Sequence, residues 1–445
     1  MRAMRRPLMV IVLLSALACG LIGIFLYNFP PIHERLSWRI ANLRAEIRYA
    51  LNPPEEIVFV PQEQQDLIEA IVQATLQALT PDAQATQALN PATLTPTRPG
   101  PTASPSSSPT PTLTPTPIPE KVELTGIVHE YQKFNNCGPA NLSMALSYWG
   151  WQGDQYDTRA YLRPSFEIDD KNVNPFEMVD FVETQTDFKA LWRVGGDLEL
   201  LKRFVAAGFP VVIEKGLQPP KEYWLGHYEI ISGYDEANSR FIVYDSYIGP
   251  DYAYPIPYSE VANYWPHFNS VYVVIYPPDR EAQVTALLGP QADPSYNFRY
   301  SAQKALDEAA TLTGRDQFFA WYNRGSNLVY LGEYAAAAEA YDTAFAIFAT
   351  LPEQERPWRI LWYQTGAYPS YYYTERYQDL INLAHTTLVN VDKPVLEETY
   401  YWRGMAKEAM GDMDGAIADL KRAADLNPRS TDAVERLNRL GVQYP

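Results

Sequence analysis

Gln132-Lys133-Phe134-Asn135-Asn136-Cys137-Gly138-Pro139-Ala140 is the stretch from which this chain can be interpreted. The 445 residues hold only two cysteines, and the other, Cys19, lies in an apolar N-terminal segment. Apolar residues at helical spacing after Cys137 predict a helix that begins there: Leu142, Ala145, Leu146 and Trp149. Gly138 allows close approach of the backbone, and Pro139 suits a first helical turn. The positive end of the helix dipole would then favour a thiolate at Cys137.

Cys137 allows two interpretations. A small buried cysteine occurs in many protein cores. The polar flank Asn135-Asn136 and the position at a helix start favour a nucleophile instead. Gln132 lies five residues upstream and can donate its side-chain amide, beside the Cys137 backbone N–H, to a developing oxyanion. The sequence thus predicts Cys137 as nucleophile and Gln132 as oxyanion donor.

A cysteine nucleophile needs a base, and histidine is the usual one. His227 follows Gly226 and opens a strongly apolar strand, and the rigid end of a strand positions a side chain well. Of the other four histidines, His33 lies near the N-terminal segment and His385 in the C-terminal repeats. His129 is near Cys137 only in sequence, and His267 lies in an expected loop. We therefore expect His227 to be the base.

Asp245 is the candidate third member. The turn cluster 235–239 separates the strand that begins at His227 from the strand that ends at Asp245. A hairpin centred on Glu236 would set His227 and Asp245 opposite each other. Asp245 could then orient the imidazole and stabilise its charge. A slip of one residue would put the two side chains on opposite faces.

Residues 121–280 are predicted to form one domain. Helices are expected after Cys137, at 175–184 and at 197–207, and strands at 210–213, 227–234, 240–245 and 270–276. Helices followed by strands without regular alternation indicate an α+β fold with an antiparallel sheet.

This domain resembles a known family. The stretches Gln132–Ala140, Gly226–Asp235 and Tyr244-Asp245 are similar to papain-like cysteine peptidases of the bacteriocin-processing (double-glycine leader) type, in their stand-alone form. The similarity covers about residues 125–278. It implies a papain-like fold, with Cys137 as nucleophile, His227 as base, Asp245 as orienting residue and Gln132 in the oxyanion hole. The family often has proline after the aspartate, whereas Ser246 follows here. The chain has no phosphate-binding loop of a transporter ATPase, so the resemblance does not imply a role in leader export.

Residues 290–445 are predicted to be a helical repeat domain. Ala320–Gly325 and Leu331–Tyr334, with the small residues that follow, resemble the tetratricopeptide repeat. The frame recurs 79 residues later, where Gly404 matches Gly325, and a degenerate copy with Gly366 lies between. A helix at 298–309 should precede the repeats and a capping helix at 431–440 should end them. Such repeats stack on one continuous core and suit recruitment of a protein or peptide partner.

The N-terminal region is predicted to anchor the chain. A basic tip precedes Leu8–Asn28, which runs 21 residues without a charge, enough to span a bilayer. Residues 1–28 are thus interpreted as cytoplasmic tip and transmembrane anchor, with a lipoprotein signal or a cleaved signal as alternatives. Membrane-proximal helices at 29–80 and a linker at 81–120 follow.

The linker indicates on which side of the membrane the domains lie. Pro, Thr or Ser occupies 20 of the 25 positions in 95–119, which together can extend about 75 Å. Such tracts are typical of extracellular stalks. The bulk of the chain is therefore expected outside a bacterial cell membrane.

These observations lead to one hypothesis and two alternatives. The net charge of −17 argues against nucleic-acid binding. No Cys/His pair has zinc-ligand spacing, so neither a metal nor a cofactor is expected. The favoured function is a membrane-anchored extracytoplasmic cysteine peptidase whose repeats recruit a protein or peptide partner. A non-catalytic peptide-binding scaffold, or a cell-wall peptide amidase or acyl transferase with the same triad, remains an alternative.

Overall fold

The computed structural model describes residues 118–164, 172–219, 223–389, 395–429 and 431–444, together with 58–62, 64–66, 69–70 and the single residues 23, 43 and 47. The chain divides into two units, one made of Met1–Pro61 with Pro119–Pro445 and the other of Gln62–Ile118. Within the part of the chain that the structure describes, no helix is long and apolar enough to cross a bilayer. The predicted anchor, most of the two membrane-proximal helices and nearly all of the linker lie outside the described residues.

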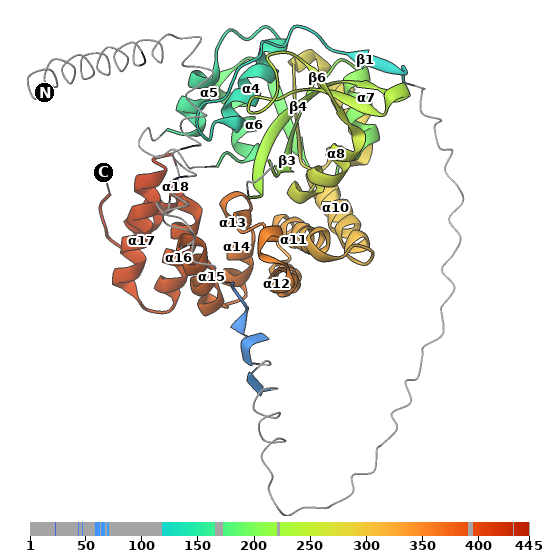
Figure 1. Cartoon of the computed structure of the whole chain (residues 1–445). Coiled ribbons are helices and arrows are strands. Elements are labelled where there is room, and N and C mark those ends of the chain that lie inside the picture. Colours follow the sequence, from blue (N-terminus) through green and yellow to red (C-terminus); the bar gives the residue numbers. More distant parts are fainter. Residues whose placement is uncertain are drawn as a thin grey trace, which may run out of the picture. The chain divides into compact units, whose positions relative to one another are not determined.

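One antiparallel sheet organises the first half of the large unit (Figure 1). The described residues hold seven strands. Six of them follow the order β2-β7-β3-β4-β5-β6, and the seventh, β1, pairs with the C-terminal end of β4. Their bounds are β1 Lys121–Glu123, β2 Lys189–Arg193, β3 Val211–Leu217, β4 Leu225–Asp235, β5 Arg240–Tyr244, β6 Tyr254–Pro257 and β7 Tyr272–Tyr276. The four predicted strands correspond to β3, β4, β5 and β7; β1, β2 and β6 were not predicted.

Helices cover both faces of this sheet. The helices α4 Cys137–Tyr148 and α6 Pro175–Gln185 share a buried apolar cluster with alternate residues of β3, β4 and β7. The helix α7 Leu198–Ala206 packs on the opposite face, where its Phe204 lies against Tyr272 of β7. The remaining helices of this half are α5 Gln155–Leu162, α8 Tyr258–Tyr264 and α9 Glu281–Leu288. The α+β class with an antiparallel sheet is therefore confirmed.

The register between β4 and β5 differs from the predicted one. Near the turn Gly233 lies opposite Ile242, but beyond Ser232 the register shifts and Ile231 lies opposite Val243. If this second register is extended, Asp245 comes opposite Glu229, two residues from His227 and on the same face. The prediction that Asp245 lies directly opposite His227 was thus wrong by two residues. The bulge at Ser232 supplies the one-residue shift that keeps both side chains on one face.

The C-terminal half is all helical. Its helices are α10 Pro294–Ala309, α11 Gly314–Tyr330, α12 Tyr334–Thr350, α13 Ile360–Tyr363, α14 Ala367–Tyr373, α15 Tyr377–Val389, α16 Glu397–Ala409, α17 Met413–Leu426 and α18 Thr431–Arg439. The glycines of the repeat frame lie where helices meet closely. A Cβ on Gly325 would come within 2.9 Å of the Tyr341 ring, and one on Gly404 within 3.0 Å of Leu420. Small residues therefore allow the paired helices to approach, as the pattern predicted.

The sheet domain and the repeats share one hydrophobic core. Trp224 and Phe268 of the first half are buried in the same cluster as Phe319 of α11. His267 stacks on Phe319 with ring centroids 4.0 Å apart, and Trp224 Nε1 donates to His267 Nδ1 at 3.1 Å. The side-chain amides of Asn269 and Asn327 bond each other at 2.8 and 3.1 Å. The repeats are thus continuous with the sheet domain rather than loosely tethered to it.

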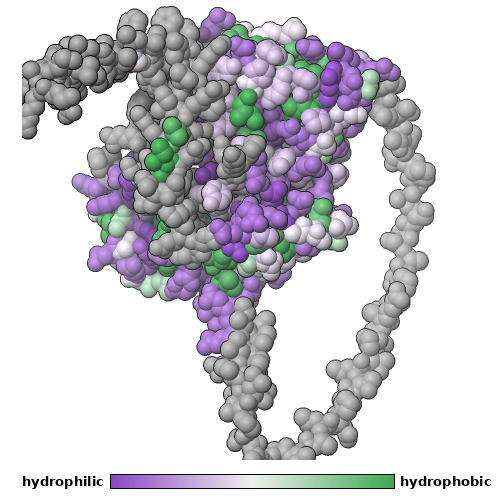
Figure 2. Space-filling model, viewed as in Figure 1, coloured by the Kyte–Doolittle hydropathy of each residue, from purple (hydrophilic) through white to green (hydrophobic). Residues whose placement is uncertain are grey.

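The described surface on the face shown in Figure 2 is mainly hydrophilic, with small separate hydrophobic patches. This distribution agrees with the excess of 53 Asp and Glu residues over 36 Lys and Arg residues. Most of the large apolar side chains of the described residues are buried in the hydrophobic clusters.

Candidate active site

Cys137 is the first residue of α4 and is partly buried. The backbone before it is held by buried side chains: Arg163 Nη1 donates to the Phe134 carbonyl at 3.1 Å, and Asn136 Nδ2 donates to Gln155 Oε1 at 2.9 Å. The first N–H groups of a helix have no hydrogen-bond partner within the helix. The Cys137 N–H at the start of α4 is therefore available to a ligand. A Cβ on Gly138 would meet Val173 at 3.0 Å, so glycine permits the close approach that the sequence suggested.

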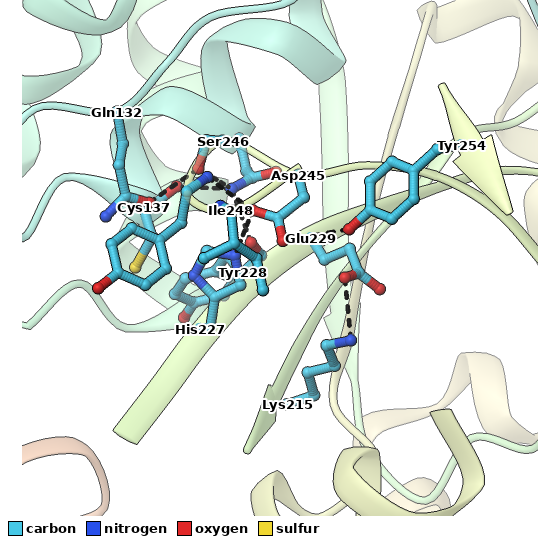
Figure 3. A network of polar contacts seen from close by, with 12 residues as sticks. Gln132, Cys137, Lys215, His227, Tyr228, Glu229, Asp245, Ser246, Ile248 and Tyr254 are labelled. Carbon is cyan, nitrogen blue, oxygen red and sulfur yellow. Dashed lines mark hydrogen bonds and ion pairs between the residues drawn. The ribbon is translucent and has the colours of Figure 1, made fainter. Parts of the chain in front are cut away.

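His227 lies between Cys137 and Asp245 (Figure 3). Its Nε2 is 2.9 Å from Asp245 Oδ1, and both side chains are almost fully buried. A carboxylate only accepts hydrogen bonds, so Nε2 carries a proton and donates it to Asp245. The other ring nitrogen, Nδ1, is left for the hydrogen bond between His227 and the Cys137 thiol. The structure thus brings together Cys137, His227 and Asp245.

Asp245 is fixed by four hydrogen bonds. Its Oδ1 accepts from His227 and also from the backbone N–H groups of Tyr247 at 2.6 Å and Ile248 at 3.3 Å. Its Oδ2 accepts from Tyr254 Oη at 3.4 Å. Burial alone would raise the pKa of Asp245, but the charge and hydrogen bond of His227 and the Tyr247 N–H together lower it to about 2. The carboxylate therefore stays ionised and holds the imidazole in one orientation.

The proton in this group belongs on the histidine. Burial alone would lower the pKa of His227, but the charge and hydrogen bond of Asp245, with a contribution from Cys137, raise it to about 10. Burial pushes the pKa of Cys137 upward, yet the hydrogen bond and positive charge of His227 outweigh it, so that the thiol pKa is lowered overall. The arrangement shifts the two groups toward thiolate and imidazolium, which is the reactive form of a cysteine nucleophile.

Gln132 is held beside this pair by a buried relay. Its backbone N–H donates to the Ser246 carbonyl at 2.8 Å, and its Oε1 accepts from Ser246 Oγ at 2.9 Å. Ser246 Oγ in turn accepts from Asn141 Nδ2 at 3.0 Å, and the same amide bonds the carbonyls of Cys137 and Tyr228. With its oxygen engaged, the Gln132 amide has its nitrogen available as a donor, which is the orientation an oxyanion hole needs.

No sequence pattern indicated a role for Asn141 or a contact for Ser246. The sequence indicated them only indirectly. Asn141 is a polar residue one helical turn after Cys137 in a helix predicted to be buried, and a buried polar residue needs hydrogen-bond partners. Both are fully buried, at 0% exposure.

A third residue that sequence reasoning missed is Glu214, whose carboxyl lies inside the apolar strand β3. Glu214 is buried and lies opposite Tyr228 of β4. The next cross-strand pair of β3 and β4 is Lys215 opposite His227. Burial raises the pKa of Glu214 well above its usual range, and its carboxyl interacts electrostatically with Cys137 and His227. A charged residue within a run of buried strand residues was the available signal.

The repeats also reach the site. A Cβ on Gly226, the residue before His227, would come within 2.9 Å of the Tyr363 ring of α13 and 2.5 Å of Phe268. Burial raises the pKa of Tyr363 to about 12, and its phenol also interacts with Cys137. The segment that carries α13 therefore borders Cys137, a position that no sequence pattern indicated.

Comparison with known families agrees with this geometry. Residues 124–273 match the Peptidase_C39 like family, and residues 320–349 and 397–430 match the tetratricopeptide repeat. The chain contains a Peptidase_C39-like domain followed by tetratricopeptide repeats. The family resemblance that the sequence suggested is confirmed at this level, while the bacteriocin-processing type and the stand-alone form stay predictions.

Individual proteins show more distant similarity. Aryl-hydrocarbon-interacting protein-like 1 of Mus musculus is 28% identical over 126 residues, which make up 27% of this chain and 38% of that protein. FK506-binding protein-like of Rattus norvegicus is 28% identical over 127 residues, 27% of this chain and 34% of that protein. The chain thus spans less than two fifths of the length of these relatives.

Two solved structures are similar to the peptidase-like part. A candidate C39-like peptidase from Bacillus anthracis has 18% identity and a TM-score of 0.31, covering 35% of this chain and 98% of that one. Xylellain, a cysteine protease from Xylella fastidiosa, has 14% identity and a TM-score of 0.28, covering 36% of this chain and 87% of that one.

Proposed function

We propose that this protein is a cysteine peptidase that hydrolyses peptide bonds with Cys137, His227, Asp245 and Gln132. The observation that supports this most strongly is the position of His227, bonded through Nε2 to a buried carboxylate and paired through its other nitrogen with the only described cysteine. This is the arrangement that activates a thiol nucleophile.

The proposed reaction has two halves. The Cys137 thiolate attacks the carbonyl carbon of the peptide, and the oxyanion accepts hydrogen bonds from Gln132 Nε2 and the Cys137 N–H. Protonated His227 gives its proton to the leaving amine as the C–N bond breaks, which leaves a thioester. His227 then takes a proton from water, the resulting hydroxide attacks the thioester carbonyl, and the carboxylic acid departs as the thiolate re-forms. Asp245 stabilises the imidazolium throughout.

The same proposal includes a location and a partner. The uncharged run Leu8–Asn28 after a basic tip, together with the Pro/Thr/Ser-rich linker, supports an anchor in a bacterial cell membrane with the peptidase domain outside. The repeats would recruit a protein or peptide and present it to the catalytic cleft, because α13 already borders that cleft.

The test uses the full chain in detergent. A thiol-reactive, peptide-like probe at neutral pH should label Cys137, and labelling should be lost in Cys137→Ala and His227→Ala but kept in His385→Ala, an exposed histidine of the repeats. Incubation with a peptide pool in ¹⁸O-labelled water should also mark new carboxyl termini. If Cys137 labels but no peptide is cleaved, the scaffold alternative replaces the peptidase. Labelling that ignores His227 would contradict the proposed activation.

A further inference from the structure

A short segment of the N-terminal region is buried in the repeats. Residues 58–61, Val-Phe-Val-Pro, precede the linker, and Phe59 is only 6% exposed. The Phe59 ring lies edge-on to Phe345 with centroids 5.1 Å apart, and 6.1 Å from the ring of Tyr371. Pro61 is buried as well, and Val58 and Val60 are half-buried. The segment reaches the repeats as an extended stretch without helix or strand (Figure 1).

The slot that holds Phe59 has fixed walls. Phe345 belongs to α12 and Tyr371 to α14, which are neighbours in successive repeats. Tyr371 Oη donates to Asp342 Oδ1 at 2.8 Å, and the guanidinium of Arg376 bonds both oxygens of Asp342 at 2.6 and 3.0 Å. The same guanidinium bonds Asp379 at 2.8 Å. Tyr371 is thereby held in place.

The middle repeat is also unusual in a way that explains the slot. Its first helix, α14, has 7 residues, against 17 in α11 and 13 in α16. The residues that precede it form the separate helix α13, whose Tyr363 turns to the peptidase-like domain. A shortened helix buries less of its neighbours, so an aromatic ring from another segment can complete the core there.

We propose that residues 58–61 are an intramolecular ligand of the repeats, held in the slot between α12 and α14. A protein partner that uses this slot must displace them, and the chemistry of the slot requires an extended segment with one aromatic ring between small apolar residues. One inserted ring makes a weak site between separate molecules. Attachment to the same chain raises its effective concentration to roughly millimolar, which is enough to keep such a site occupied.

Docking of this segment sets the reach of the peptidase domain. Residues on both sides of 62–118 belong to the same folded unit. While Phe59 is docked, the distance from the anchor to the peptidase domain is set by the residues before Phe59, and when it is displaced the linker adds its length. This consequence for reach rests on the proposed membrane anchor, whereas the docking itself does not.

Peptide binding tests the proposal. A fluorescent peptide of residues 55–63 is titrated into the full chain and into its Phe59→Asp variant, which empties the slot by placing a charge on the segment. We expect the variant to bind the peptide at least ~10-fold more tightly than the unaltered chain, because the tethered segment competes in the latter. A peptide carrying the same Phe→Asp change should bind neither chain. Equal affinity for both chains, or no binding to the variant up to about 1 mM, would overturn the proposal.

A second measurement guards against a variant that misfolds. A photoreactive benzoylphenylalanine replaces Phe59 in the otherwise unaltered chain, and crosslinks are mapped by mass spectrometry. Crosslinks to α12 and α14 near Phe345 and Tyr371, reduced by excess free peptide, are expected; crosslinks confined to other segments refute the docking. Failure of the proposed peptidase activity would show instead as lost Cys137 labelling, with the crosslinks unchanged.

Discussion

Ser246 Oγ donates a hydrogen bond to Gln132 Oε1 at 2.9 Å, and this bond decides which end of the Gln132 amide is available to a substrate. The direction of each hydrogen bond in this relay follows from which atoms can donate and which can only accept. Asn141 Nδ2 bonds two backbone carbonyls, which only accept hydrogen bonds, so Asn141 must present its nitrogen to Ser246 as well. Ser246 then has its own proton left for Gln132. Ser246 thus holds the Gln132 amide in one orientation.

Replacement of Ser246 should weaken the oxyanion hole without removing it. Ser246→Ala frees the Gln132 amide to rotate, and we expect the affinity for a peptidyl aldehyde, which forms a hemithioacetal with Cys137, to fall about 10-fold. Gln132→Ala removes the donor and should cost about 100-fold or more. Ser246→Thr keeps the hydroxyl and should retain most of the affinity. Inhibition constants for the variants check this.

The double variant distinguishes positioning from a general structural effect. If Ser246 acts through Gln132, then Ser246→Ala should cost little more in a Gln132→Ala background. Costs that simply add would mean that Ser246 affects the site by another route.

The reactivity of Cys137 should extend well below the pH at which ordinary thiols ionise. The pKa of Cys137 is lowered by its contact with His227, against the effect of burial. Alkylation of Cys137 by iodoacetamide, followed by peptide mapping to separate it from Cys19, should therefore be faster at pH 7 than that of an ordinary thiol. An ordinary thiol would be only about a few per cent ionised at that pH. In His227→Gln the rate at pH 7 should fall at least ~10-fold, and an unchanged rate would contradict the ion pair.

The same pair predicts how stability depends on pH. His227, with its pKa raised from 6.5 to about 10, contributes stability that is complete below pH 6.5 and is lost as the pH rises toward 10. Cys137, with its pKa lowered from 9.0, contributes stability that is complete above pH 9.0 and is lost as the pH falls through its folded value. Where the pH lies above both 6.5 and the folded pKa of Cys137 but below 9.0, the folded and unfolded states bind equal numbers of protons at these two groups, so the changes of the two contributions with pH offset each other.

Cys137→Ala should uncover the histidine contribution. Asp245 still raises the pKa of His227 in this variant, so the urea midpoint should decline more steeply between pH 6.5 and 9.0 than that of the unaltered chain, in which the Cys137 contribution rises with pH. Asp245, with its pKa lowered from 3.8 to about 2, adds a loss of stability in both proteins as the pH falls through that range. Parallel urea curves from pH 6 to pH 9 measure the difference. Identical slopes for the two proteins would show that His227 is not charged beside Asp245.

The bulge at Ser232 explains why the site could be predicted although its register could not. The hydrophobic pattern located both strands, and the order of cysteine, histidine and aspartate matched a known family. A turn cluster, however, does not reveal where a strand carries an extra residue. Near the turn the β4–β5 register would put His227 and Asp245 on opposite faces, and the bulge restores the common face. The right pair was therefore named from a register that was wrong by two residues.

Other parts of the site depend on contacts that no local pattern carries. Tyr363 lies more than a hundred residues from Gly226, and no local pattern placed it against the strand. The role of Glu214 could not be predicted, because the apolar pattern of a strand indicates burial but does not identify the residues opposite it in the sheet. Periodicity predicted the repeat helices well, because each pair closes over short range. Their union with the sheet domain depends on long-range packing and emerged only in the structure.

That union gives the last prediction, which concerns how the chain unfolds. Phe319 of α11 is 1% exposed and contacts both Trp224, at a centroid distance of 5.4 Å, and His267 from the sheet domain. Phe319→Ala should destabilise the protein by about 3–5 kcal/mol, because it opens a cavity in a core that both halves build. Met413→Ala, at a residue 45% exposed, should change stability by no more than about 0.5 kcal/mol.

Hydrogen exchange in urea can follow the two halves separately. Peptides from α4, in the sheet domain, and from α12, in the repeats, should lose protection at one common urea concentration, and Phe319→Ala should move both midpoints together. If α12 lost protection while α4 kept its own midpoint, the repeats would be a separate folding unit. Tyr363 and His267 join the two halves beside the strand that carries His227. A shared transition would therefore mean that a destabilising mutation in the repeats also lowers the stability of the proposed catalytic site.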